Sequence, residues 1–160
     1  GALLLIFFNN PLGNWIQIRG VQFVFDSNGI ILAQLVTTLG VATRLTKTAM
    51  DEIPQRYEDV ARTLGASPAA AFFNVTLPLC RRGLAAAFIL SWAKAMGEFG
   101  ATITLAGTMA MKTETLPIAI FMKLSTADID GTVVLILIMT AIGIGTLYTV
   151  RLISRKGLHA

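Results

Sequence analysis

The sequence predicts an all-α membrane protein, a multi-span helical bundle. The 160-residue chain is 54% hydrophobic and only 14% charged, and its mean hydropathy of +0.69 exceeds the range usual for soluble globular domains. Apolar stretches of nearly spanning length recur along it, since about 20 residues cross the roughly 30 Å of hydrocarbon in a bilayer. Basic residues cluster at the ends of these stretches, as membrane topology requires.

Three apolar stretches are predicted to cross the membrane. The first covers about residues 29–43, the second about 83–106 and the third, the most uniformly apolar, about 132–153. Residues 1–8 are predicted to be the end of a further span. We therefore expect the chain, 1–160, to be the C-terminal portion of a single transmembrane domain whose N-terminal spans are missing.

The distribution of basic residues predicts the orientation. Two regions have more basic than acidic residues and are predicted to be cytoplasmic. Segments 9–28 and 107–131 have no such basic excess and are predicted to lie outside. Within the latter, residues 116–124 ("LPIAIFMKL") are too few to span and are expected to form a re-entrant or interfacial turn. The cytoplasmic basic residues are Arg44, Lys47, Arg56, Arg62, Arg81 and Arg82 before the second span, and Arg151, Arg155 and Lys156 at the C-terminus.

Several functional classes find no support in the sequence. The basic residues are not interleaved with aromatic residues along one face, so nucleic acid is not an expected partner. There is no Gly-x-x-x-x-Gly-Lys-Ser/Thr pattern for nucleotide phosphates. One cysteine, Cys80, and one histidine, His159, supply neither a disulfide framework, nor a metal site, nor a hydrolase site. No catalytic residue, metal ligand or cofactor is expected in this chain.

The cytoplasmic segment of about residues 44–82 is predicted to contain a helix that ends sharply. In residues 51–64 the acidic residues come early and Arg62 comes late, with Pro54 near the start, as in a helix aligned with its own dipole. Gly65 then supplies the left-handed residue that ends the helix.

A second helix is predicted directly after this turn. Ser67 is expected to cap it, and Pro68 fits its first turn, where no amide donor is needed. This helix is expected to run to about Val75 and to stop before Pro78. The predicted unit is a helix, a sharp turn and a helix outside the bilayer.

The spacing in this unit resembles the "EAA" loop of ABC-importer permeases, which reads Glu-Ala-Ala, three residues, Gly, nine residues, Ile-x-Leu-Pro. Here the pattern reads Asp59-Val60-Ala61, then Gly65, then Val75-Thr76-Leu77-Pro78, and Glu58 precedes it. The resemblance implies a type I importer permease with a cytoplasmic coupling-helix loop that docks on an ATPase. An ordinary hairpin between spans is the alternative. The implied ATPase-coupling residues are Glu58, Asp59, Ala61, Arg62, Gly65, Ala66, Ser67, Leu77 and Pro78.

The roles of three arginines in this region remain open. Arg62, Arg81 and Arg82 either pair with acids of the partner or hold the membrane topology.

A charged pair lies inside the second predicted span. Lys94 and Glu98 stand at positions i and i+4, where pairing lowers the cost of placing charges in hydrocarbon. Gly97 and Gly100 flank Glu98, so close helix packing or a kink is expected there. Residues 97–102, "GEFGAT", are followed by "LAG". This sequence is similar to permeases of the molybdate, tungstate and sulfate group, and more to the molybdate/tungstate type.

The resemblance also bears on the translocation path or gate. A negative Glu98 is a poor oxyanion ligand, so we expect it to organise the bundle or the gate; a direct role in the anion path is the alternative. Thr102 and Thr104, as neutral donors, are better candidates for that path. The candidate residues for the translocation path or gate are Lys94, Gly97, Glu98, Gly100, Thr102 and Thr104.

Together with "PLG" near residue 11 and "TLPIAI" at 115–120, the resemblance covers nearly the whole chain. It implies the permease subunit of an ATP-driven importer of molybdate or tungstate in the cell membrane, with the coupling loop and the C-terminus cytoplasmic. Implied partners are a second permease copy, forming a homodimer, cytoplasmic ABC ATPase subunits carrying ATP and Mg, and an external oxyanion-binding protein. The alternatives are a sulfate permease of the same family, an ion-coupled secondary transporter using Lys94 and Glu98, and a non-transporting membrane scaffold.

Overall fold

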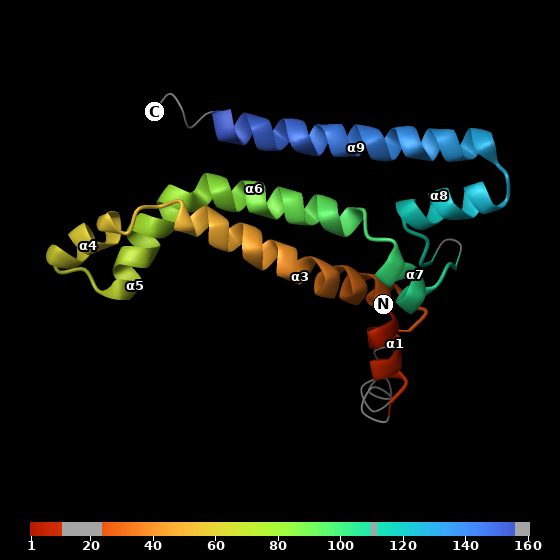
Figure 1. Ribbon diagram of the computed structural model, residues 1–160, viewed down its shortest axis with the longest axis horizontal. Coiled ribbons are helices and arrows are strands. Elements are labelled where there is room, and N and C mark those ends of the chain that lie inside the picture. The colour runs from red at the N-terminus through yellow and green to blue at the C-terminus, as the bar shows by residue number, and fades with distance from the viewer. Residues whose placement is uncertain (11–23, 110–111, 156–160) are drawn as a thin grey trace. The chain divides into compact units, whose positions relative to one another are not determined.

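The computed structural model describes residues 1–10, 24–109 and 112–155, and this part of the chain is helical, without a strand (Figure 1). The predicted all-α class is confirmed. Three of its helices are long and apolar enough to cross a membrane, namely Ser27–Asp51, Pro68–Met96 and Ile129–Ile153. The "PLG" near residue 11 and the histidine at 159 lie outside the described residues.

The chain divides into two compact units. The first combines Gly1–Leu39 with Ala93–Ile144, and the second combines Gly40–Trp92 with Gly145–Ala160. The long helices each contribute residues to both units, because their bounds cross these divisions.

The core of the first unit is formed by small and aliphatic residues. Its helices are α1 (Ala2–Phe8), α7 (Gly100–Ala106), α8 (Leu116–Ser125), the start of α3 (Ser27–Asp51) and most of α9 (Ile129–Arg155). Ala33 of α3 is buried against Ala101 and Leu105 of α7. α1 also contacts α7 (Figure 1). Small side chains at these positions let the helix backbones approach closely.

A turn before α3 is joined to the end of α7. The amide of Phe25 donates to the carbonyl of Leu105 at 3.1 Å, and Asp26 forms an ion pair of 3.1 Å with Lys112. Gly107 has φ +71°, and a Cβ atom there would lie 2.8 Å from Cδ1 of Phe25. The backbone angle therefore favours glycine at this position, and a larger residue would also have to displace the Phe25 ring.

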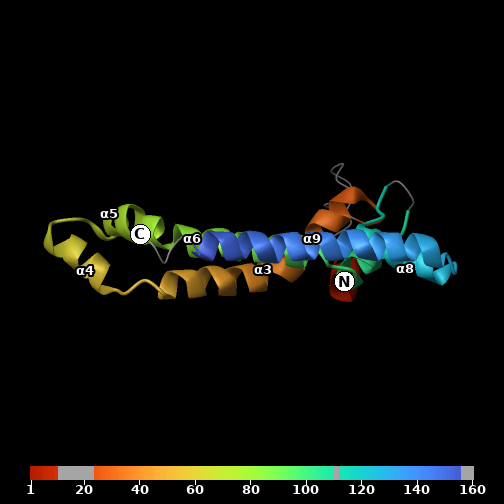
Figure 2. The ribbon, with the colours of Figure 1, turned by 90° about the horizontal axis from the view of Figure 1, so that it is seen from above.

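A tight corner links α8 to α9 (Figure 1), and the two helices overlap when seen from above (Figure 2). Ala127 adopts φ +58°, and the Asp128 carboxylate accepts the amide of Gly131 at 2.9 Å, which caps the start of α9. Lys123 of α8 pairs with the same carboxylate at 2.6 Å. At ten residues, α8 has too few residues to span a membrane, in agreement with the prediction for residues 116–124.

In the second unit, the end of α3 packs on α6 (Leu77–Met96), and the two helices run side by side there (Figure 1). Between them in sequence lie α4 (Arg56–Thr63), α5 (Pro68–Ala71) and the π-helix Phe72–Thr76. Cys80 and Ala87 are buried on α6, and Ala49 is buried on α3. The contact is again made by small residues.

Two predicted helix boundaries are wrong here, in addition to the one at Pro78. The first cytoplasmic helix begins at Arg56, since Pro54 disfavours helical backbone at the residue before it, and Asp51 belongs to α3. The second predicted span, 83–106, is interrupted, because α6 ends at Met96 and residues 97–99 are not helical. Glycine is a poor helix former, and Gly97 starts this break.

The helix that begins at Pro68 does not stop before Pro78. In a regular α-helix the Pro78 ring would collide with the carbonyl four residues earlier. Here a π turn precedes it, and the amide of Leu77 bonds to the carbonyl of Phe72, five residues back. The wider turn accommodates Pro78 as the second residue of α6, so the helix is continuous from Pro68 to Met96.

Candidate functional site

The turn between α4 and α5 is a Schellman motif. The amide of Ala66 donates to the carbonyl of Ala61, and the amide of Gly65 donates to that of Arg62, both at 3.0 Å. Gly65 has φ +91°, as predicted for the left-handed residue at the helix end. A Cβ atom at Gly65 would meet nothing within 4 Å, so it is the backbone angle that requires glycine.

The second helix of this unit starts as predicted. The Ser67 hydroxyl accepts the amide of Ala70 at 3.2 Å, and Pro68 is the first helical residue. Among the other predicted coupling residues, Leu77 is partly buried and Pro78 is exposed at the start of α6. The unit around the turn, residues 56–78, contains the predicted coupling residues and is for that reason called the coupling knob below.

Two large apolar side chains are exposed on the coupling knob. Val60 and Leu64 stand one helical turn apart at the end of α4, with 58% and 84% of their surfaces exposed. No residue of α4 is buried. An exposed apolar stripe on a short helix is typical of a surface that docks into a groove of a partner.

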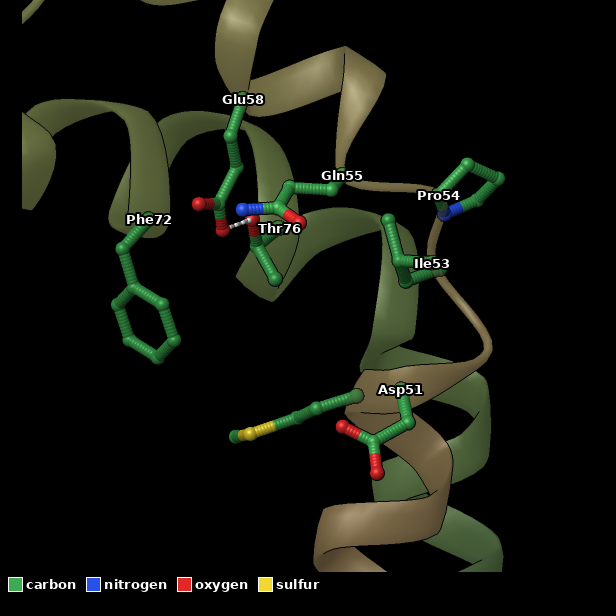
Figure 3. Close-up of a pocket in the computed structure, with 8 residues that line it drawn as sticks. Asp51, Ile53, Pro54, Gln55, Glu58, Phe72 and Thr76 are labelled. Carbon is green, nitrogen blue, oxygen red and sulfur yellow. Dashed lines mark hydrogen bonds between the residues drawn. The ribbon is translucent and has the colours of Figure 1, made fainter.

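The two acidic residues at the start of α4 have different surroundings. The Thr76 hydroxyl, from the π-helix, donates a hydrogen bond to Oε1 of Glu58 (Figure 3). Nη2 of Arg62 lies 4.0 Å from Oε2 of the same carboxylate. Asp59, the next residue, is exposed. Glu58 is thus engaged within the coupling knob, which leaves Asp59 as the acid presented to solvent.

A cavity of about 560 Å³ opens beside this contact. Figure 3 shows Glu58 and Thr76 pointing toward each other on one side, with Asp51 at the end of α3 on the other. The remaining lining residues are Met50, Ile53, Pro54, Gln55 and Phe72. The side of α4 that faces this cavity is therefore not closely packed.

The break between α6 and α7 is organised by Glu98. Nζ of Lys94, in the last turn of α6, lies 2.7 Å from the Glu98 carboxylate, and that carboxylate also accepts the amide of Ala101 in α7 at 3.1 Å. The predicted pairing of Lys94 with Glu98 is confirmed. Only 13% of the Glu98 side chain is exposed, against 44% for Lys94. One carboxylate thus neutralises a lysine and caps the start of the next helix.

The other predicted path residues have contrasting environments. Thr102 is fully buried, and its hydroxyl has no hydrogen-bond partner among the described residues. Thr104 is exposed, and its hydroxyl bonds to the carbonyl of Gly100 at 2.5 Å. Gly97 is the first residue of the break and Gly100 is the first residue of α7, where a Cβ atom would meet nothing within 4 Å. The Thr102 hydroxyl is therefore available to donate a hydrogen bond, whereas the Thr104 hydroxyl already donates one within its own helix.

Sequence reasoning missed two residues that take part in these arrangements. Thr76, two positions before Pro78, is not among the predicted coupling residues, although its hydroxyl contacts Glu58. Thr37 of α3 bonds to the carbonyl of Ala33 at 2.9 Å, and its hydroxyl also lies beside the Glu98 carboxylate. Nothing local in the sequence indicates that second contact.

The described residues contain no group of three or more His, Cys, Asp or Glu side chains that could hold a metal ion.

Similar proteins are transport components of bacterial membranes. The molybdenum transport system permease protein ModB of Haemophilus influenzae is 36% identical over 129 residues, which cover 79% of this chain and 56% of that protein. ModB of Escherichia coli is 34% identical over 132 residues, covering 79% of this chain and 56% of the relative. The sulfate transport system permease protein CysW of Synechocystis is 36% identical over 120 residues, covering 74% and 44%.

The chain spans about half the length of the curated relatives it matches. The family model described as "Binding-protein-dependent transport system inner membrane component" matches residues 2–158, almost the entire chain. The chain therefore belongs to the family of inner membrane components of binding-protein-dependent transport systems.

Proposed function

We propose that this chain forms the membrane path of an ATP-driven oxyanion importer, and that its coupling knob joins this path to a separate ATPase. It acts as a transport subunit, not as an enzyme. The observation that carries the proposal is the coupling knob, in which Gly65 ends α4 in a Schellman motif and Ser67 caps a helix that continues into a candidate membrane span. A partner that moves such a knob moves the span with it.

Molybdate or tungstate is the proposed cargo. Relatives named as molybdenum permeases are up to 36% identical, and a sulfate permease reaches the same identity over a shorter length. The "GEFGAT" and "LAG" segments of this chain favour the molybdate type. Sulfate, also a tetrahedral dianion, is the alternative cargo.

The proposed gate lies at the break between α6 and α7. Glu98 neutralises Lys94 and caps α7, so it organises the gate and does not bind the anion. The unused hydroxyl of buried Thr102 is the stronger candidate for contact with an oxyanion. Thr104 is a weaker candidate, because its hydroxyl is engaged with Gly100. Uncharged hydrogen-bond donors suit a transported anion, because they bind it weakly enough to let it leave.

The importer requires partners outside this chain. These are a second permease copy, two cytoplasmic ATPase subunits that bind ATP and Mg²⁺, and an external oxyanion-binding protein. ATP binding draws the two coupling knobs together and opens the path outward, and hydrolysis resets it. The excess of basic residues at 44–82 and at the C-terminus supports a cytoplasmic position for both regions.

The primary test is co-purification of the complete membrane subunit with its candidate ATPase, comparing the wild type with Gly65→Arg. The variant places a long charged side chain at φ +91° on the coupling knob. We expect the ATPase to be lost while the membrane subunit still inserts. Gly143→Ala is the matched control, since this helical glycine of α9 also borders open space.

Uptake into vesicles that contain the assembled complex then identifies the cargo. We expect ATP-dependent uptake of molybdate and tungstate in preference to sulfate when the binding protein is present. Failure of the wild-type subunit to bind any ATPase would refute the proposal. Uptake driven by an ion gradient without an ATPase would instead support a secondary transporter.

A further inference from the structure

Glu58 and Thr76 join two helices of the coupling knob, and we propose that their hydrogen bond is a positioning strut. The strut sets the angle of α4 relative to the continuous helix of residues 68–96, so that the docking surface and the membrane span move as one body. The inference rests on the proposed function, because the angle of α4 matters to transport only if α4 docks on a partner.

Burial makes this hydrogen bond significant for the orientation of α4. Thr76 is only 6% exposed, and the Glu58 side chain is 25% exposed. Removing one partner leaves the other poorly solvated, which costs more than the loss of a hydrogen bond at the surface.

The π turn explains why Thr76 faces α4. Ala71 and Thr76 are both buried, and the residues that follow on this face are Cys80, Ala87 and Ser91. Five positions separate Ala71 from Thr76, which is about 1.4 turns of an α-helix, but a π turn inserts one extra residue and so brings positions five apart onto nearly the same face. In a regular α-helix, Val75 would follow Ala71 on the buried face. The π turn thus places a hydroxyl, instead of an aliphatic side chain, opposite Glu58.

Besides this hydrogen bond, α4 is held by contacts with α5 and the π-helix, and these contacts fully bury none of its residues. The helix has eight residues, none of them buried, and isolated helices of that length are marginal in water. Beneath it lies the cavity of about 560 Å³. The bond from Thr76 to Glu58 therefore adds a directional side-chain contact that ties α4 to the helix of residues 68–96.

The first experiment measures the strut without any partner. Amide hydrogen exchange is followed in the complete membrane subunit for the wild type, Thr76→Val and Thr76→Ser. We expect exchange in residues 56–63 to accelerate about tenfold in the valine variant, since a hydrogen bond to a charged group is lost, and to stay near wild type in the serine variant. Thr48→Val is the matched control, because the Thr48 hydroxyl bonds only within α3, to Arg44. Unchanged exchange in Thr76→Val would overturn the strut.

The second experiment tests whether the strut positions the docking surface. Glu58→Gln keeps an oxygen that accepts the Thr76 hydroxyl, and Glu58→Ala does not. We expect the alanine variant to bind the ATPase about tenfold more weakly and to hydrolyse more ATP per oxyanion transported. The glutamine variant should stay near the wild type in both measurements. Combining Glu58→Ala with Thr76→Val should be no worse than either change alone.

The outcomes separate the two proposals. A wild-type subunit that binds no ATPase refutes the proposed function and leaves the strut nothing to position. A wild-type subunit that binds the ATPase, with Thr76→Val altering exchange but neither binding nor the ATP consumed per oxyanion, overturns the positioning role alone.

Discussion

A Cβ atom added at Gly83 of α6 would lie 2.8 Å from the Cβ of Ala49 in α3 and 3.4 Å from its Cα. Real Cβ atoms do not approach each other so closely, so the two helices are in backbone contact at this point. Contacts of this kind between small residues bring membrane helices together without a large apolar side chain.

Replacing Gly83 with alanine is therefore expected to destabilise the membrane subunit. The added methyl group meets the base of a neighbouring side chain that cannot move aside, and overpacking of this kind costs about 1–3 kcal/mol. Thermal unfolding in detergent measures the effect. Gly40→Ala in α3 is the matched control, because a Cβ atom there meets nothing within 4 Å. Equal unfolding temperatures for the two variants would contradict the close contact.

The angle at Gly65 predicts a different kind of loss. Alanine at φ +91° is strained by about 1–2 kcal/mol, whereas asparagine tolerates left-handed backbone better. We expect Gly65→Ala to loosen the turn and Gly65→Asn to loosen it less, without a change in the unfolding temperature of the spans. Limited proteolysis at the turn reports the difference. If the alanine variant resisted proteolysis as well as the wild type, the strain argument would be wrong.

At the helix break, Glu98→Ala is expected to cost more than Glu98→Gln. Alanine removes both the partner of Lys94 and the acceptor for the Ala101 amide, and losing a helix cap costs about 1 kcal/mol. Glutamine keeps an acceptor oxygen and loses only the ion pair. Unfolding temperature and oxyanion uptake are the measurements, with the exposed Glu114→Gln as control. Normal assembly and transport in Glu98→Gln would remove the Glu98 charge from the mechanism.

The corner before α9 predicts a dependence on pH. The hydrogen bond from Lys123, followed by that from the amide of Gly131, lowers the pKa of Asp128. A lowered pKa in the folded state means that this stabilisation is present above the pKa of an unfolded Asp, near 4, and is lost as pH falls through the folded value. We expect acid destabilisation below about pH 4 to be smaller in Asp128→Asn, which still caps the helix. Unfolding followed from about pH 6 to pH 3 tests this, with Asp130→Asn as control. An identical pH profile for Asp128→Asn and the wild type would be the contrary result.

The sequence by itself determined the helical membrane class, the presence of three candidate spans and the chemistry of the turn at Gly65. These features depend on hydropathy and on residues within one or two helical turns, such as Ser67 capping the amide of Ala70. The pairing of Lys94 with Glu98 was equally predictable, because only four positions separate the two residues.

Only the tertiary structure decided which distant residues meet. Thr76 bonds to Glu58 across 18 positions, and the backbone of Phe25 bonds to that of Leu105. The helix through Pro78 was mispredicted for a related reason. Proline normally ends a helix, but a π turn stabilised by contacts with α4 gives Pro78 the room it needs. Local patterns record the preferences of the chain, whereas such exceptions depend on contacts that form only when separate helices pack together.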